Sequence, residues 1–222
     1  MEFDAVLISP RRAAMIRDGH WHDRTINDDL DACVAQCPDK LALTAGSLDN
    51  ATVRRFTWRE LAAIADRVAV GLARLGVAKN DVVSCQLPNW WQFTVMYLAC
   101  SRIGAVINPL MHIFRERELS FMLAHGRSKV VIVPKQFCGF DFEAMLRGLQ
   151  PSLPDLAHVL AIGGQGPDSF EARLTVHPRG APHMRDPTRL IAGTTAVYGE
   201  QATQALYGRI RAIDPARMLE TP

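Results

Sequence analysis

Several short runs in this sequence contain residue types that bind ligands or catalyse reactions. One of these runs is rich in glycine. Gly163-Gly164-Gln165-Gly166 follows an apolar stretch typical of a strand, which is where nucleotide-binding loops occur. Such a loop needs another glycine at a set offset, a helix whose amides face the phosphate, and an acidic residue on a second strand. The sequence lacks these features, so it favours a plain loop.

Cysteine and histidine side chains are the next candidates, as metal ligands or nucleophiles. Cys33 and Cys37 fall on one face of a predicted helix, but a tetrahedral zinc site needs about two further ligands. His20 and His22 do not follow a zinc-binding spacing, which favours core packing of the two cysteines. No histidine has a serine or cysteine partner in a recognisable nucleophile motif such as Gly-x-Ser-x-Gly. We therefore assign no metal ligand and no catalytic residue.

Two adjacent tryptophans, Trp90 and Trp91, follow a predicted strand. Large aromatic side chains at such a place fill the interface between a sheet and a helix, and they can also form a wall of a substrate site. The sequence favours packing, and the substrate wall stays as an alternative.

These residues have to be positioned by secondary structure, and hydrophobic spacing predicts an alternation of strands and helices. Thr57-Trp58-Arg59-Glu60 is a capping box, after which apolar residues recur every three or four positions until Gly76. Helices are predicted over 27–37 with Asn27 as the cap, 58–75, 91–103, 115–125 and 141–149, and strands over 41–44, 52–56, 82–87, 105–108, 129–134 and 158–162. The short separation of the first two predicted strands, 41–44 and 52–56, favours a hairpin. The later alternation predicts an α/β fold with a parallel sheet and flanking helices.

Composition limits the class of protein. The chain has 222 residues, 25 basic and 23 acidic side chains, a formal charge of +2 and 48% hydrophobic residues. A near-neutral chain without basic runs argues against nucleic acid and anionic membranes as partners. The longest apolar stretch, 90–100, is too short to cross a bilayer, and the first residues lack a signal-peptide pattern. Five scattered cysteines are typical of free thiols in a reducing compartment, so we expect a cytoplasmic protein without a transmembrane segment.

Four groups of residues between positions 56 and 133, and another near the start, follow one another in the order found in a large enzyme family. They are Phe56-Thr57-Trp58-Arg59-Glu60-Leu61; Gly71-Leu72-Ala73-Arg74-Leu75-Gly76-Val77 with Asp81-Val82-Val83; Leu87-Pro88-Asn89-Trp90-Trp91-Gln92-Phe93 with Tyr97-Leu98-Ala99-Cys100 and Ile103-Gly104-Ala105-Val106; Asn108-Pro109-Leu110 with Arg115-Glu116-Arg117-Glu118-Leu119; and Asp23-Arg24-Thr25-Ile26-Asn27-Asp28. The sequence thus resembles the N-terminal part of an AMP-forming acyl-CoA synthetase of the adenylate-forming superfamily. It is most similar to cyclohexanecarboxylate and medium-chain acid-CoA ligases. The resemblance covers residues 1–165 and implies an incomplete N-terminal portion of that fold.

The resemblance implies a two-step activation of a carboxylic acid. Such enzymes join the carboxylate to the α-phosphate of ATP and release pyrophosphate, and the thiol of CoA then displaces AMP. ATP, CoA and Mg²⁺ are the implied cofactors, because magnesium and cationic side chains offset the charge on the phosphates. The implied substrate is a medium-chain or alicyclic carboxylic acid, and the implied role lies in fatty acid metabolism.

The family's phosphate loop reads Ser-Gly-Thr-Thr-Gly-x-Pro-Lys-Gly, and the resemblance places its counterpart at 191–199. Three residues of this stretch match and are the implied cofactor-binding residues: Gly193, Thr194 and Thr195. Ala192 lacks the serine hydroxyl, Ala196 replaces a glycine, and no lysine follows Lys135. The loop therefore resembles a degenerate remnant.

The leading hypothesis divides the chain at about residue 165. Residues 1–165 form the N-terminal part of an AMP-binding ligase domain, whereas 166–222, with seven arginines and five prolines in 171–222, form a divergent, weakly ordered tail. We expect a truncated member, altered by a frame change or a misjoined end, without adenylation activity of its own. The alternative is a non-catalytic binding or assembly module derived from such a ligase, which docks to a complete ligase subunit or retains affinity for an apolar ligand. An exposed sheet edge would allow self-association as well. A dinucleotide-binding Rossmann protein fits the alternation but lacks the glycine fingerprint.

Overall fold

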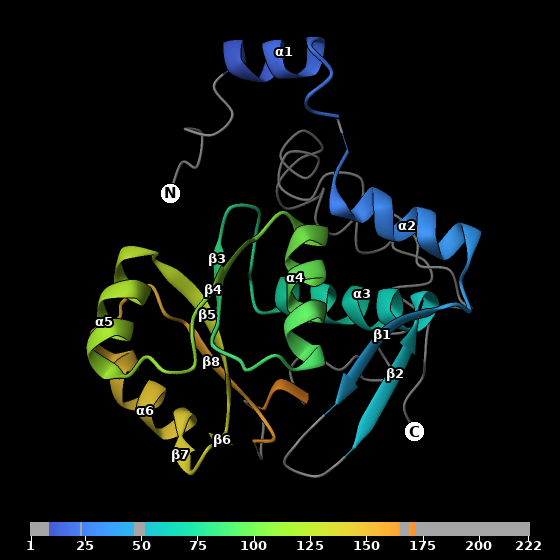
Figure 1. Ribbon diagram of the computed structural model, residues 1–222. Helices are drawn as coiled ribbons and strands as arrows, with labels where there is room; N and C mark the ends of the chain where they lie inside the picture. Colours follow the sequence, from blue (N-terminus) through green and yellow to red (C-terminus); the bar gives the residue numbers. More distant parts are fainter. Residues whose placement is uncertain (1–8, 23, 47–51, 165–168, 172–222) are drawn as a thin grey trace.

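The centre of the molecule is a parallel sheet. The computed structural model describes residues 9–22, 24–46, 52–164 and 169–171. Within them, parallel strands lie in the order β4 (Val106–Pro109), β3 (Val82–Cys85), β5 (Ser128–Pro134) and β8 (His158–Ile162) (Figure 1). The central strands β3 and β5 are almost entirely buried, as expected of strands that are covered on both faces. The predicted α/β fold with a parallel sheet is confirmed.

Helices cover both faces of this sheet. They are α3 (Trp58–Arg74), α4 (Trp91–Ile103), α5 (Glu116–His125) and α6 (Phe142–Leu149). Val130 and Ile132 of β5 join the apolar core under α3 and α4, whereas Val131 and Val133 join the core under α5 and α6. Successive side chains of a strand point to opposite faces, so the alternate residues of β5 belong to two cores.

The ends of α3 and α4 follow from local chemistry. The Glu60 amide donates to the Thr57 hydroxyl over 3.3 Å, and the Glu60 carboxylate accepts from the Thr57 amide over 2.8 Å, which completes the predicted capping box. Gly76, just beyond α3, has φ +81°, and Gly104, at the end of α4, has φ +69°. Both angles favour glycine, so the predicted helix ends are confirmed to within a residue.

The first core helix, α2 (Ile26–Gln36), corrects one detail of the sequence prediction. Asn27 is not the cap, because Thr25 occupies that position. The Asp28 carboxylate accepts hydrogen bonds from the Thr25 amide over 2.7 Å and from the Thr25 hydroxyl over 2.9 Å. The Asn27 amide group instead donates to the Ser101 hydroxyl of α4 over 3.1 Å. Asparagine and threonine both occur at helix caps and in contacts between helices. Residue type and spacing alone therefore did not identify the correct cap residue.

Two hairpins accompany the parallel sheet. The predicted hairpin is present as β1 (Leu41–Gly46) paired antiparallel with β2 (Val53–Thr57). A second one, β6 (Gln136–Phe137) with β7 (Phe140–Asp141), was not predicted. Its turn consists of Cys138 with φ +49° and Gly139 with φ +74°, a pair of positive angles typical of a type I′ turn. The helix α1 (Ser9–Arg17) and the short helix η2 (Gln150–Ser152) were also not predicted.

A row of polar side chains crosses three neighbouring strands inside the sheet. The Asn108 amide group of β4 donates to the Ser84 hydroxyl of β3 over 2.9 Å, and Ser84 shares a 2.6 Å hydrogen bond with the Ser128 hydroxyl of β5. Ser84 and Ser128 are buried. A buried hydroxyl without a partner is costly, so this row favours the observed register of the strands over a slipped one.

A described segment, 169–171, lies just beyond the predicted boundary at residue 165. A bridge between Ala161 and Ser169 is the last pairing along β8 that the structure describes. The predicted tail lies, apart from 169–171, outside the described residues, so its weak order stays a prediction. Within the described ranges, no helix combines the length and the apolar character needed to span a bilayer.

Candidate functional site

The carboxyl ends of the parallel strands define the candidate site. Open α/β sheets bind ligands where two neighbouring strands send their connections to opposite faces. β3 and β5 are such neighbours, since β3 leads to α4 on one face and β5 leads to α6 on the other. We call the segments that follow β3, β4 and β5, residues 86–90, 110–115 and 135–141, the carboxyl edge.

Gln86 lies at the centre of the carboxyl edge, directly after β3. Its backbone amide donates to the Ile132 carbonyl over 2.9 Å, which ties it to β5. Its side-chain Nε2 donates to the carbonyls of Met111 and Phe114, over 2.9 and 3.1 Å. The Gln86 side chain is fully buried, and its Oε1 has no hydrogen-bond partner. A buried glutamine therefore binds the segment after β4 to the end of β3.

Three aromatic rings from three segments meet at the carboxyl edge. The rings of Trp90 and Phe137 lie 5.9 Å apart at 87°, and those of His112 and Phe137 lie 5.3 Å apart at 86°. Such edge-to-face contacts are favourable for aromatic pairs. Trp91 packs elsewhere, 5.3 Å from the Phe56 ring and 5.6 Å from the Arg54 guanidinium. The packing expected of the two tryptophans is confirmed, and Trp90 in addition lies at the candidate site.

Arg115 fixes the same segment from the other side. Its Nη1 donates to the carbonyls of His112 and Phe114, each over 2.8 Å. The guanidinium lies 4.2 Å from the centroid of the Phe140 ring and 5.1 Å from that of Phe142. Cation–π contact of this kind suits the planar, weakly hydrated guanidinium. Arg115 and Gln86 together bind three carbonyls of residues 111–114, so this segment is held by side chains from both neighbours.

The buried thiols near the sheet are not activated nucleophiles. Burial raises the pKa of Cys85, to which the charge of Cys100 adds, and burial raises the pKa of Cys100 to about 12. A thiol with such a pKa stays protonated at neutral pH and is unreactive. Cys33 and Cys37 are free, and the described residues contain no group of three potential metal ligands. The expectation that no metal ligand can be assigned stays a prediction.

The candidate residues of the sequence analysis are only partly placed. Gly193, Thr194 and Thr195, the implied cofactor-binding residues, lie outside the described residues. Gly163 has φ +73° and follows β8, and Gly164 is described beside it, but the rest of that glycine-rich run is not. The carboxyl edge as described brings three aromatic rings together and fixes the carbonyls of residues 111–114.

A parallel sheet with a switch point between β3 and β5 is the architecture of nucleotide- and cofactor-binding α/β proteins. A profile of the family described as AMP-binding enzyme matches residues 30–195. The chain belongs to the AMP-binding enzyme family, as the resemblance implied.

Individual relatives agree with this family. A medium-chain fatty-acid–CoA ligase of Escherichia coli K12 is 32% identical over 165 residues, which are 74% of this chain and 28% of the ligase. A salicyl-AMP ligase of Mycobacterium tuberculosis is 35% identical over 164 residues, covering 73% of this chain and 29% of the ligase. The apo structure of Mycobacterium smegmatis MbtA superimposes with a TM-score of 0.64 at 28% identity, covering 75% of this chain and 30% of MbtA. The chain therefore spans less than a third of the length of these relatives.

Sequence reasoning missed the two residues that organise the carboxyl edge. Gln86 was included in a predicted strand, and Arg115 was used only as part of a family motif. A signal existed for Gln86, because an amide side chain at the end of an otherwise apolar buried run must have a partner. For Arg115 no local signal existed, since its ring contacts come from residues 25 and 27 positions further along the chain.

Proposed function

We propose that this chain provides the amino-terminal sheet layer of an enzyme that activates a carboxylic acid with ATP and transfers the acyl group to CoA. The observation that carries the proposal is the family match over residues 30–195, which includes every strand of the parallel sheet. The relative from Escherichia coli is a medium-chain fatty-acid–CoA ligase, which supports a medium-chain acid as the substrate and a role in fatty acid metabolism. The proposal of an alicyclic acid rests on the sequence resemblance alone. Five free cysteines favour a cytoplasmic location.

We further propose that residues 1–222 do not catalyse adenylation by themselves. Ala192 and Ala196 replace the hydroxyl and glycine of the family's phosphate loop, and no lysine follows Lys135 to contact the triphosphate. Gly193, Thr194 and Thr195 are then a remnant of that loop, and they fall at the end of the family match. The described residues offer no cluster of metal ligands for Mg²⁺, so none of them is assigned to the ion.

Pyrophosphate exchange tests the catalytic part of this proposal. The purified chain is incubated with ATP, Mg²⁺, labelled pyrophosphate and a panel of medium-chain and alicyclic acids, beside a complete medium-chain ligase as the positive control. We expect no acid-dependent exchange above that of the double variant Thr194→Ala, Thr195→Ala. Circular dichroism confirms that both proteins are folded. Exchange that depends on the acid and disappears in the double variant would show that the chain is an active adenylating enzyme.

An assembly module is the second candidate, and the open side of β4 favours it. Among the described residues β4 pairs only with β3, whereas β8 at the opposite edge has a bridge to Ser169. An unpaired strand edge can pair with another chain, so self-association through β4 follows from this geometry. Sedimentation velocity of the native chain and of Val106→Lys tests it. A dimer that the lysine abolishes supports the module, and a monomer at all concentrations contradicts it.

A further inference from the structure

The helix α2 lies against α3 and α4 with little apolar contact. Leu30 is the fully buried residue of α2, and Val34 is partly buried beside it. In contrast, α3 buries Leu61, Val68 and Leu72 among other residues. Because burial of apolar surface is the main favourable term in packing, α2 depends on polar contacts more than its neighbour does.

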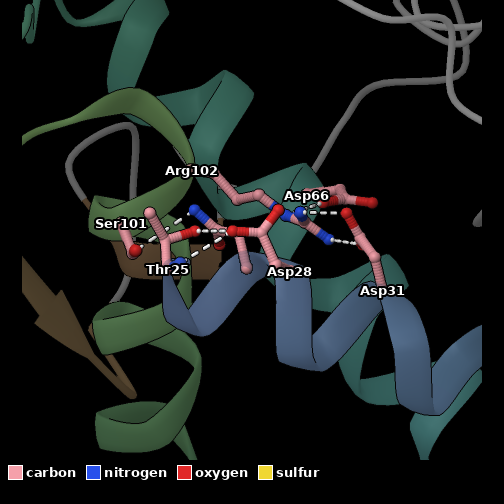
Figure 2. A network of polar contacts seen from close by, with 7 residues as sticks. Thr25, Asp28, Asp31, Asp66, Ser101 and Arg102 are labelled. Atoms are coloured by element: carbon pink, nitrogen blue, oxygen red, sulfur yellow. Dashed lines mark hydrogen bonds and ion pairs between the residues drawn. The ribbon is translucent and has the colours of Figure 1, made fainter. Parts of the chain in front are cut away.

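Two side chains of α2 contact the last turn of α4. The Asp31 carboxylate accepts two hydrogen bonds from the Arg102 guanidinium, from Nη1 over 2.9 Å and from Nη2 over 2.5 Å. The Asn27 amide group donates to the Ser101 hydroxyl over 3.1 Å. Figure 2 shows Arg102 between Asp31 of α2 and Asp66 of α3. The arginine thus joins three helices.

The two aspartates on Arg102 are not equivalent. Arg102 Nε donates to the Asp66 carboxylate over 3.0 Å, and the side chains of Arg102 and Asp66 are 17% and 11% exposed. The Asp31 side chain is 47% exposed. If α2 moved away, Asp31 would gain water and Arg102 would keep Asp66. No buried charge would then be left without a partner. An unpaired buried charge is the main cost of breaking a buried ion pair, so this cost would not arise.

We propose that α2 is a detachable element, with Arg102 as its attachment point. Asp66 and Arg102 stay paired in the docked and the undocked form, and Asp31 is the contact that breaks. Undocking exposes Leu30 and the α2 thiol Cys33, which is half-buried in the docked form. The two aspartates then have opposite effects on undocking. Loss of Asp31 favours undocking, because it removes the contact that holds α2 to Arg102. Loss of Asp66 opposes undocking, because Asp31 would then be the remaining carboxylate on Arg102 and undocking would separate the two.

Thiol labelling of the full chain measures this equilibrium. Iodoacetamide labelling is followed by mass spectrometry for each cysteine separately. Cys138 is exposed and gives the reference rate, while Cys85 of β3 and Cys100 of α4 are buried in the core and report its unfolding. We expect Asp31→Asn to accelerate labelling of Cys33 about twofold to fivefold, the range of a partly exposed ion pair. Asp66→Asn should slow it, with Cys85 and Cys100 unchanged in both variants.

Matched controls separate the attachment from a general effect of charge. Asp29→Asn removes the same charge from α2, but Asp29 pairs with Arg24 and not with α4, so the Cys33 rate should stay unchanged. Raising the salt concentration from about 0.05 to 0.5 M should accelerate labelling in the native chain and not in Asp31→Asn. Equal effects of Asp31→Asn and Asp29→Asn would overturn the proposal. Faster labelling of Cys85 and Cys100 together with Cys33 would also overturn it. The comparison of Asp31→Asn with Asp29→Asn tests the proposal even if Asp66→Asn does not fold.

Discussion

At the scale of single residues, a carboxylate at the start of α2 has an altered acidity. Hydrogen bonds from the Thr25 backbone amide and hydroxyl hold the pKa of Asp28 below its ordinary value of 3.8, and the nearby Arg24 charge adds to the effect. A group whose pKa is lower in the folded state stabilises that state above its unfolded pKa. The contribution is lost as the pH falls through the folded pKa.

We therefore predict that the start of α2 becomes less stable when the pH is lowered from about 5 to 2. An NMR titration of the Asp28 carboxyl should have its midpoint below 3.8, and the amide signals of the first turn should change with the same midpoint. Thr25→Val removes the hydroxyl donor and should move the midpoint upward. A midpoint at or above the ordinary value would contradict the capping geometry.

Backbone strain at Cys138 leads to a second prediction at this scale. A residue other than glycine at φ +49° is in the left-handed region, which costs about 1–2 kcal/mol for most side chains and less for asparagine. Cys138→Asn should therefore raise the free energy of unfolding by about 0.5–1 kcal/mol, measured with urea.

A substitution at the neighbouring residue, Gly139, should lower the stability of the same turn. A Cβ at Gly139 would meet nothing within 4 Å, so Gly139→Ala adds backbone strain without a clash. It should lower the free energy of unfolding by about 1 kcal/mol. Equal effects of the two substitutions would show that the turn is not of the type I′ form.

At the scale of elements, a side chain from the end of β3 and one from the start of α5 hold the segment between β4 and α5. Gln86 and Arg115 bind the carbonyls of Met111, His112 and Phe114, which would otherwise lack strand or helix partners. The segment can therefore keep Met111 and Ile113 exposed while its backbone is fixed. This explains how a connection without regular structure contributes to an ordered edge.

Replacing the buried amide tests this account. Gln86→Leu keeps the volume but removes one donor from each of the carbonyls of Met111 and Phe114, which keep the Phe114 amide and the Arg115 guanidinium as donors. We therefore expect a loss of about 2 kcal/mol in the free energy of unfolding. Gln92→Leu is the matched control, because Gln92 Oε1 also lacks a partner and Gln92 does not contact this segment through a described hydrogen bond. The control should lose less than about 1 kcal/mol. Similar losses in both variants, measured with urea, would argue against the role of Gln86.

At the scale of the whole molecule, stability is concentrated in the centre of the sheet. β3 and β5 are flanked by strands on both sides and by helices on both faces, and two apolar cores meet across β5. α1 and α2 lie away from the parallel sheet (Figure 1), and the described core includes Leu30 of α2, with Val34 packed against it. Local opening should therefore be least frequent in β5 and more frequent in α2.

Hydrogen exchange measures this gradient directly. The amides of residues 130–133 should exchange at the rate of global unfolding, and those of α2 should exchange faster by local opening. Leu72→Ala, which removes a fully buried side chain of α3, should accelerate the slow amides and lower the free energy of unfolding by about 3 kcal/mol. Exchange in α2 as slow as in β5 would place α2 within the central cooperative unit.

The sequence by itself determined the elements that depend on near neighbours. The capping box at Thr57, the glycine after α3 and the apolar run of β5 each involve residues a few positions apart, so spacing predicted their helices and strands to within a few residues. The family was also readable from short ordered motifs, and the match over residues 30–195 confirmed it. The tail after 165 and the phosphate-loop residues stay predictions.

Only the tertiary structure decided which side chains meet across the chain. Arg102 and Asp31 are 71 positions apart, and Gln86 and Phe114 are 28 positions apart, so no local spacing relates them. Capping by Thr25 instead of Asn27 was settled in the same way, because Asn27 has a partner on α4. Local periodicity fixes where helices and strands form, whereas packing of the finished elements fixes which polar groups must pair.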